Sequence, residues 1–221
     1  MKSHPSIDFI KQTFESLKNI KMHKDTPVIL AHDYNQDKKY IEYLNRLKEY
    51  IADKPNTKLV VRDSPGHLTG NVRNAFNYVE TEYVLLIQHD LPFIRSFEIE
   101  KVIEDMKTNP EMKHIRFNKR SNIKAIADAL NGLFGKQIKS VNYTYTRTPG
   151  WSDQNHLCRA DYYRTIVLNE CADGKFMEQY LHGRSTTEEK HSKYGTYLFG
   201  GVNHPAVIKH TDGRMNCKAL V

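Results

Sequence analysis

The chain has 221 residues, of which 39% are hydrophobic and 27% are charged, and its formal net charge is +7. This length suits one substantial α/β domain, and the composition excludes a chain that is disordered throughout. The amino-terminal stretch MKSHPSIDFIKQTF has no apolar signal core, and no apolar run reaches the roughly 18 residues of a membrane span, so we expect a cytoplasmic protein without an integral membrane segment.

Cysteine content and charge narrow the kinds of site and partner. Cys158, Cys171 and Cys217 are widely spaced and form no CxxC pair, so neither a disulfide framework nor a structural zinc site is expected. The positive charge favours an anionic partner, such as nucleic acid, a membrane surface or a phosphorylated small molecule. Because the basic residues alternate with acidic ones and no basic run is interleaved with aromatic residues, we do not expect nucleic-acid binding.

Helices and strands alternate in the amino-terminal part of the chain. Apolar spacing and turn residues predict a helix over Ile7–Ile20, a strand over Val28–Ala31, a helix over Lys38–Ala52, a strand over Lys58–Val61, a helix over Asn71–Tyr78 and a strand that begins at Tyr83. This alternation is typical of a doubly wound parallel sheet. Right-handed crossovers then place the polar carboxyl ends of these strands on one side of the sheet.

The remaining residues give less regular signals. They predict a helix over Phe97–Met106, a strand over His114–Phe117, a helix over Asn122–Leu133, a strand over Val141–Thr146, a loop over Trp151–Asn155, mixed strand and helix over His156–Leu168, a short helix over Phe176–Leu181 and short strands over Thr196–Phe199 and Ala206–Ile208. The stretch HGRSTTEEKHSKYG between Leu181 and Thr196 has almost no apolar content. We expect it to be a mobile loop that closes over a bound substrate.

The apolar strand that begins at Tyr83 stops abruptly on Gln88, His89 and Asp90, in the sequence YVLLIQHDLPF. Taken alone, these polar residues favour a simple end to the strand. However, ligands of open α/β sheets bind at the carboxyl ends of the strands, which favours a binding site here. Asp90 suits a hard divalent cation that is also held by substrate phosphates.

A second candidate site is the segment GHLTGNVRN, which runs from Gly66 to Asn74. Glycines before a helix allow the backbone to approach a phosphate, and the helix amino terminus together with Arg73 favours negative charge. Since a lone GxxxG pattern is weak, an ordinary loop is an equally good interpretation of this segment by itself.

The order of these parts resembles the nucleotide-binding half of GT-A glycosyltransferases, especially the family 2-like enzymes. The matching residues are Tyr34-Asn35, Asp63, Gly70 with Arg73-Asn74, and Gln88-His89-Asp90. The resemblance is good over Val28–Phe93 and loose elsewhere. It implies a single GT-A (Rossmann-like) domain with a central, mostly parallel mixed sheet flanked by helices, in which residues 1–95 bind the nucleotide sugar and residues 96–221 bind the acceptor.

The resemblance also implies roles for individual residues on the donor side. The donor is a nucleotide-diphosphate sugar and the cofactor is Mn²⁺ or Mg²⁺. Asp90 binds the metal, and a late histidine, either His210 or His204, completes the metal shell. One departure from the family pattern is Gln88, which stands in place of the first carboxylate of a DxD motif and can only hydrogen-bond the ribose or a metal-bound water. His89 is then an additional candidate ligand.

The other residues that the resemblance assigns to the donor are Asp33, Tyr34 and Asp63, which are expected to line the nucleoside pocket, and Gly70, Arg73 and Asn74, which are expected near the diphosphate. Of these, Arg73 carries the charge that would help to neutralise the departing diphosphate.

In the acceptor half, the resemblance implies a carboxylate base at the start of a helix, and the matching residue is Glu178 in KFMEQYL. Its role requires hydrogen-bond reach of the acceptor hydroxyl. Asp153 in GWSDQNH is the competing base, and Asp173 is a weaker one. Trp151, the only tryptophan, is expected either to stack on an acceptor sugar or to pack in the core.

These observations together predict an inverting, divalent-metal-dependent glycosyltransferase that transfers a hexosyl or deoxyhexosyl group to a hydroxyl of a glycan or glycoconjugate. A sugar nucleotidyltransferase is the main alternative, and its Gly-rich loop with Arg after the first strand has no counterpart in AHDYNQDKK. A non-catalytic basic module that binds polyanions is the second alternative, and steep salt dependence of binding would favour it.

Overall fold

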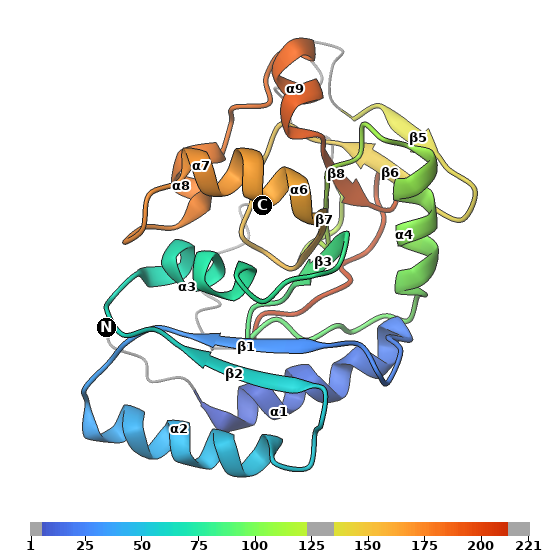
Figure 1. Ribbon diagram of the computed structural model, residues 1–221. Helices are drawn as coiled ribbons and strands as arrows, with labels where there is room; N and C mark the ends of the chain where they lie inside the picture. The colour runs from blue at the N-terminus through green and yellow to red at the C-terminus, as the bar shows by residue number, and fades with distance from the viewer. Residues whose placement is uncertain (1–5, 123–134, 212–221) are drawn as a thin grey trace, which may run out of the picture.

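The computed structural model describes residues 6–122 and 135–211, which form a mixed α/β fold (Figure 1). The helices are α1 Ile7–Ser16, α2 Lys38–Ile51, α3 His67–Phe76, α4 Ile99–Thr108, α6 Ala160–Tyr162, α7 Leu168–Glu170, α8 Met177–Leu181 and α9 Glu188–Tyr194, with a 3-10 turn at Leu17–Ile20 and a π-helical turn at Tyr163–Val167. The strands are β1 Val28–His32, β2 Thr57–Val61, β3 Tyr83–Leu86, β4 His114–Arg116, β5 Gln137–Lys139, β6 Thr144–Arg147, β7 His156–Arg159 and β8 Thr196–Phe199.

The strands of the described residues form two sheets. Strands β1 and β2 pair in parallel, and a six-stranded sheet has the order β3-β7-β4-β8-β6-β5. Strands β4 and β8 are parallel neighbours, whereas the other neighbours in this sheet are antiparallel because β7 and β6 run against the rest. The predicted mixed sheet flanked by helices is confirmed, but the neighbouring strand pairs are mostly antiparallel, and β3 lies in a different sheet from β1 and β2.

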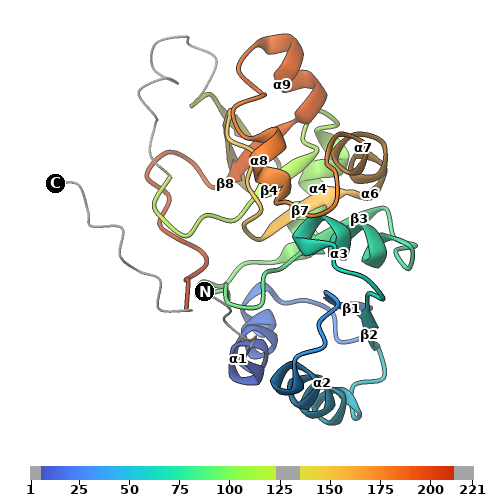
Figure 2. The same cartoon turned by 90° about the vertical axis from the view of Figure 1, so that its left-hand side faces the viewer.

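The two-stranded sheet is covered by α1 and α2 on one side, with α3 on the other (Figure 1, Figure 2). Helix α2 begins at the N-cap Asp37, whose side chain accepts a hydrogen bond from the backbone N–H of Lys39. Tyr40, Tyr43 and Leu47 follow at helical spacing and are buried against Leu30, Leu59 and the α1 residues Ile7 and Ile10. Burial of each such side chain contributes roughly 1.5 to 3 kcal/mol, which fixes the position of the β1 end.

The six-stranded sheet separates two further cores. Helix α4 packs Val102 and Met106 with Ile115 of β4 on one side, and α3 packs Val72 and Phe76 with the aromatic residues of the 160–168 region on the other. Helix α3 contacts both β1 and β2, whereas β3, which was expected in the same sheet, belongs to the six-stranded sheet.

The predicted mobile loop between Leu181 and Thr196 contains helix α9, so this prediction was wrong for Glu188–Tyr194. Thr187 caps the helix by accepting a hydrogen bond from the N–H of Lys190, and Glu188 and Glu189 in the first turn complement the helix dipole. Gly195, with a φ of 52°, ends the helix in the left-handed conformation that glycine favours. The capping residues thus stabilise this helix despite the low apolar content of its sequence.

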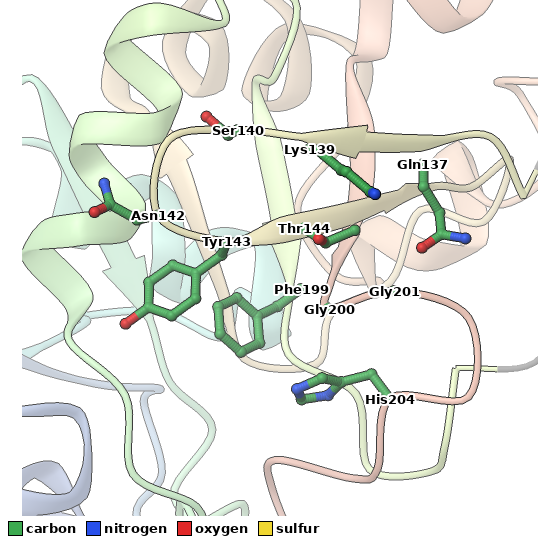
Figure 3. A pocket seen from close by; sticks show the side chains of 10 residues that line it. All are labelled: Gln137, Lys139, Ser140, Asn142, Tyr143, Thr144, Phe199, Gly200, Gly201 and His204. Atoms are coloured by element: carbon green, nitrogen blue, oxygen red, sulfur yellow. The ribbon is translucent and has the colours of Figure 1, made fainter.

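The edge of the six-stranded sheet also differs from the prediction. The expected strand over Val141–Thr146 is β6, which starts at Thr144 because Ser140–Tyr143 form the turn of a hairpin with the unpredicted β5. A pocket of about 440 Å³ lies on this hairpin, between Thr144, Phe199 and His204 (Figure 3). The expected strand over Ala206–Ile208 is reduced to a single bridge between Phe93 and Ile208. Residues 123–133 of the predicted helix Asn122–Leu133 lie outside the described residues.

No helix within residues 6–122 and 135–211 is long and apolar enough to cross a bilayer. The two cysteines in these ranges, Cys158 and Cys171, are buried and form no disulfide.

Buried histidines make the folded state sensitive to acid. Burial lowers the pKa of His32, His156 and His191 from 6.5 to about 4 in each case. The unfolded chain therefore binds protons between pH 6.5 and about 4 that the folded chain excludes. For His156, which is 1% exposed, this difference corresponds to about 3 kcal/mol.

We predict that the free energy of unfolding decreases as the pH is lowered from about 6.5 to about 4. Denaturant titrations at a series of pH values measure this change, and calorimetry in buffers of different ionisation enthalpy measures the accompanying uptake of protons on unfolding. An unfolding free energy that stayed constant or rose over this range would contradict the assignment of neutral buried imidazoles.

Candidate functional site

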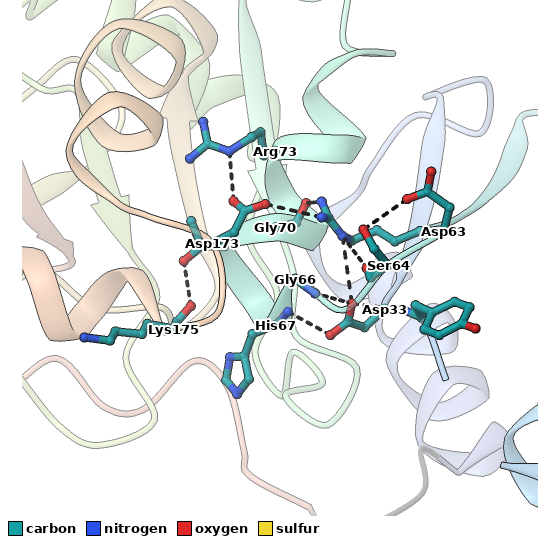
Figure 4. Close-up of polar contacts among 12 residues, drawn as sticks. Asp33, Asp63, Ser64, Gly66, His67, Gly70, Arg73, Asp173 and Lys175 are labelled. Atoms are coloured by element: carbon teal, nitrogen blue, oxygen red, sulfur yellow. Dashed lines mark hydrogen bonds and ion pairs between the residues drawn. The ribbon is translucent and has the colours of Figure 1, made fainter. Parts of the chain in front are cut away.

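Asp33, which follows β1, anchors the start of α3. Its two carboxylate oxygens accept hydrogen bonds from the backbone N–H groups of Gly66 at 2.8 Å and His67 at 2.7 Å (Figure 4). Because these groups lie at the amino terminus of a ten-residue helix, the carboxylate also complements the positive end of the helix dipole. The side chain of Asp33 is thus occupied by protein contacts at the place where a nucleoside contact was predicted.

Arg73 and Gly70 belong to the same polar network (Figure 4). Arg73 donates from Nε to Oδ1 of Asp173 at 2.9 Å and from Nη2 to the carbonyl of Cys171 at 2.7 Å. Arg62 donates to the carbonyl of Gly70 at 2.8 Å and lies 3.3 Å from the other oxygen of Asp173. The predicted diphosphate-binding arginine therefore ties α3 to the segment before α8, and Asp173, the weakest base candidate, is its partner.

The remaining predicted donor residues lie around this network. Tyr34 is half-buried and donates its backbone N–H to Asp33 at 2.9 Å. Asp63 is exposed and accepts a hydrogen bond from the hydroxyl of Ser64 at 3.1 Å. Asn74 is half-buried on α3. The structure brings Asp33, Tyr34, Gly70 and Arg73 together, with Asp63 and Asn74 at the edge.

The turn after β3 brings together the two predicted metal ligands. Asp90 is 5% exposed, and its Oδ2 lies 3.1 Å from Nε2 of His210. The next residue, Thr211, donates both its backbone N–H and its hydroxyl to the carbonyl of Asp90 at 3.0 Å. The alternative ligand, His204, instead packs on Phe199 and hydrogen-bonds the carbonyl of Pro205. His210 and Thr211, near the carboxyl-terminal end of the described residues, thus both contact Asp90.

A carboxylate oxygen and an imidazole nitrogen at this separation fit a divalent cation such as Mn²⁺, which accepts both kinds of ligand. Within the described ranges, no group of three or more His, Cys, Asp and Glu side chains is placed to hold a metal ion. A cation at Asp90 and His210 would therefore take its other ligands from water and substrate phosphates. His89 is exposed, and its ring lies 6.4 Å from that of Phe9 on α1, which is away from this pair.

Gln88 connects the same turn to a pocket of about 400 Å³. Its side-chain amide donates to the carbonyl of Asp153 at 2.8 Å, and its backbone N–H donates to the side chain of Asn155 at 2.9 Å. The pocket is lined by Gln88, Lys119, Asp153, Gln154, Phe176, Glu178, Gln179 and His182. The structure thus places both base candidates in one pocket that begins at the predicted metal-binding turn.

The carboxylates of Asp153 and Glu178 each accept a hydrogen bond from the backbone N–H of the other residue. Oδ2 of Asp153 accepts the N–H of Glu178 at 3.2 Å, and Oε2 of Glu178 accepts the N–H of Asp153 at 3.2 Å and the hydroxyl of Ser152 at 2.8 Å. The other oxygen of Glu178 lies 4.0 Å from Nδ1 of His182. One oxygen of Glu178 is therefore fixed in place, while the second lies near His182, which lines the same pocket.

Burial raises the pKa of Asp153 to about 7; the N–H donated by Glu178 opposes this rise, and the negative charge of Glu178 adds to it. Oδ1 of Asp153 is buried and has no hydrogen-bond partner. A buried oxygen without a donor favours the protonated acid. Asp153 therefore changes its charge close to neutral pH, directly beside Glu178.

Trp151 does not present a face to a sugar. Its indole is fully buried, donates from Nε1 to the hydroxyl of Tyr162 at 3.1 Å and lies 5.0 Å from the ring of His114. The expectation that Trp151 stacks on an acceptor does not fit this structure, because the aromatic cluster around β7 encloses it. The core-packing alternative describes its contacts.

Two residues that line the pocket and two that support it had no distinctive sequence signal. Ser152 positions Glu178, Asn155 holds the turn after β3, and Lys119 and His182 line the pocket. The polar loop GWSDQNH was the one available indication for two of them, but nothing in it distinguished Ser152 and Asn155 from ordinary loop residues.

We predict that Arg73 contributes to stability through Asp173. Each of Arg73→Ala and Asp173→Ala should lower the free energy of unfolding by about 1 kcal/mol, and the double variant should lose less than the sum, because both side chains are partly exposed and act on each other. Chemical denaturation of the four proteins measures the coupling. Strict additivity, together with a loss of nucleotide-sugar affinity in Arg73→Ala alone, would instead indicate a direct contact with the donor.

Comparisons with known proteins bear on the family and the fold of the chain. The family model described as Glycosyl transferase family 2 matches residues 2–166. No curated protein matches the chain. Among solved structures, the mannosyltransferase PcManGT from Pyrobaculum calidifontis, in complex with GDP-Man and Mn²⁺, superposes with a TM-score of 0.57 and 11% identity. This match covers 97% of the chain but only 56% of that protein, so the chain spans little more than half of its length.

An apo UDP-glucose pyrophosphorylase is a more distant match, with a TM-score of 0.44 and 11% identity over 92% of this chain and 80% of that one. The mannosyltransferase likeness shows a GT-A fold, and the family model accounts for most of the chain. The chain belongs to glycosyl transferase family 2.

Proposed function

We propose that this family 2 glycosyltransferase is divalent-metal dependent and transfers a monosaccharide from a nucleotide-diphosphate sugar, with inversion, to a hydroxyl of a glycan or glycoconjugate. The observation that carries the proposal is that Asp90 and His210 lie 3.1 Å apart. Asp90 belongs to the turn that contains Gln88, and Gln88 lines the same pocket as Glu178. A metal-capable pair and a carboxylate base are the two parts that such a transfer requires at neighbouring places.

On the donor side, Asp90 and His210 would hold Mn²⁺ or Mg²⁺. The cation supplies positive charge that offsets the negative charge of the diphosphate as it leaves. Gln88 keeps its side-chain amide on the carbonyl of Asp153 and so holds the turn in position. Lys119 lines the pocket and contributes a second positive charge, whereas the guanidinium of Arg73 is engaged with Asp173.

On the acceptor side, Glu178 is the base. Ser152 and the N–H of Asp153 hold one carboxylate oxygen, so the other is oriented to accept the proton of an acceptor hydroxyl. That hydroxyl oxygen forms a bond to the anomeric carbon as the bond from this carbon to the diphosphate oxygen breaks on the opposite face. The configuration at the carbon is thereby inverted, and the proton stays on Glu178 until solvent removes it.

Asp153 acts as a positioning residue in this proposal. Its Oδ2 holds the N–H of Glu178 at the start of α8, and its burial disfavours an additional negative charge beside the base. The hydrogen bond from the N–H of Glu178 to Asp153 thus maintains the geometry of the base.

We predict that Asp90→Asn removes metal-dependent donor binding. A sugar nucleotide at a hundred times its dissociation constant should stabilise the wild type by about 2.7 kcal/mol in the presence of Mn²⁺, and most of this gain should disappear in the variant. Thermal-shift assays with a panel that includes GDP-mannose and UDP-glucose measure it. Asp53→Asn, which changes an exposed carboxylate after α2, is the control and should bind normally.

Equal stabilisation of wild type and Asp90→Asn by sugar nucleotide and Mn²⁺ would contradict the proposed metal site. The product identifies the reaction class, because glycosyl transfer releases a nucleoside diphosphate, whereas a sugar nucleotidyltransferase converts nucleotide sugar and pyrophosphate into a nucleoside triphosphate and a sugar 1-phosphate.

We predict that Glu178→Gln and Asp153→Asn have different kinetic effects. Glu178→Gln keeps an oxygen for Ser152 but cannot take a proton, so the transfer rate should fall by roughly 10² to 10⁴ with donor affinity retained. Asp153→Asn keeps an acceptor for the N–H of Glu178, so turnover should remain within about tenfold of wild type. The reverse order, with Glu178→Gln active and Asp153→Asn inactive, would make Asp153 the base.

A further inference from the structure

Phe176 is an exposed aromatic residue inside the pocket that holds the candidate base. It is 44% exposed, although large hydrophobic side chains in the described ranges are mostly buried. It lines the pocket together with Glu178, two residues further along the chain. Ligand pockets are commonly lined by aromatic side chains together with a small number of polar groups, as this pocket is.

The position of Phe176 is fixed from two sides. It is the N-cap of α8, with extended backbone angles of −83° and 140°, and the following helical turn is held by Asp153. Its ring meets the ring of His67 edge to face at a centroid distance of 4.4 Å. The exposed ring is therefore held in place before any ligand binds, which reduces the ordering entropy lost on binding.

The side chains around the ring supply hydrogen-bonding groups for a polyol. The amides of Gln154 and Gln179 both donate and accept, and Lys119 and His182 add further polar nitrogens. A pyranose ring has an apolar face of C–H groups and a rim of hydroxyls. An aromatic surface bordered by amides matches both of these features.

We propose that Phe176 is the platform on which the acceptor sugar stacks, so that one pyranose hydroxyl is directed to Glu178. This inference rests on the proposed function and specifies its acceptor as a pyranoside. Phe176 takes the role that sequence reasoning gave to Trp151, which is enclosed in the core.

The nucleoside of the donor is the other substrate group that stacks on aromatic side chains. The residues expected to line the nucleoside pocket, Asp33, Tyr34 and Asp63, are absent from the lining of the pocket that contains Phe176 and Glu178. The shared pocket with the base therefore favours the acceptor as the group that contacts Phe176.

Saturation-transfer NMR on the full chain tests the platform without requiring turnover. Aromatic protein resonances are saturated in the presence of methyl α-D-mannopyranoside, methyl β-D-glucopyranoside, uridine monophosphate or guanosine monophosphate. Phe176→Ala should reduce transfer to the C–H protons of the bound pyranoside by about fivefold, and Phe176→Tyr should restore it. Tyr78→Ala is the matched control, since Tyr78 is also 44% exposed but lies outside this pocket.

Three results would overturn the platform: no transfer to either pyranoside in the wild type, equal transfer in wild type and Phe176→Ala, or a loss confined to the nucleobase protons of the monophosphates. The proposed function fails separately, through donor binding that does not depend on Asp90. Pyranoside contact with Phe176 and metal-dependent donor binding are thus measured independently.

Discussion

A buried amide holds the turn on which the candidate site depends. Asn155 is fully buried; its side-chain oxygen accepts the N–H of Gln88 at 2.9 Å, and its side-chain nitrogen donates to the carbonyl of Leu91 at 2.7 Å. These two bonds close both ends of the turn that carries Asp90. Since Asn155 immediately precedes β7, and β7 pairs with both β3 and β4, the turn is fixed to an interior strand of the larger sheet. A buried amide that is satisfied in this way specifies one arrangement, because any other leaves polar atoms unpaired.

The candidate site divides into a rigid scaffold and an open pocket. Asp33, Arg62, Arg73 and Asp173 neutralise one another where β1, α3 and the segment before α8 meet, so their charges hold elements together. Glu178 and Phe176 line the open pocket beside that segment. The same network thereby sets the position of α8, which couples the residues predicted for the donor to the residues proposed for the acceptor.

Local patterns in the sequence were sufficient for much of the fold. Apolar spacing located α1, α2 and α4, and the abrupt end of the apolar strand located Asp90. The pairing of Asp90 with His210 was reached only through family resemblance, because no spacing rule connects residues that lie so far apart in the sequence. Helix α9 was missed because its evidence lay in the caps Thr187 and Gly195 and not in apolar periodicity.

The contacts of Arg73 and Trp151 that the sequence did not indicate share one physical cause. The roles of Arg73 and Trp151 depend on which neighbours fill their surroundings, and those neighbours, Asp173 and Tyr162, come from distant parts of the chain. Residue type indicated a phosphate contact for Arg73 and a sugar contact for Trp151, whereas the structure shows Arg73 paired with Asp173 and Trp151 buried against Tyr162. Phe176 was overlooked because exposure of a lone aromatic residue cannot be read from a sequence.

Anomalous diffraction from a crystal grown with Mn²⁺ and a nucleotide-diphosphate sugar tests the central claim most directly. The account predicts a manganese peak within about 2.0 to 2.4 Å of both the Asp90 carboxylate and Nε2 of His210, with the donor phosphates completing the coordination. A peak bound to other side chains, or a bound donor with the Asp90–His210 contact intact and no metal beside it, would contradict the account.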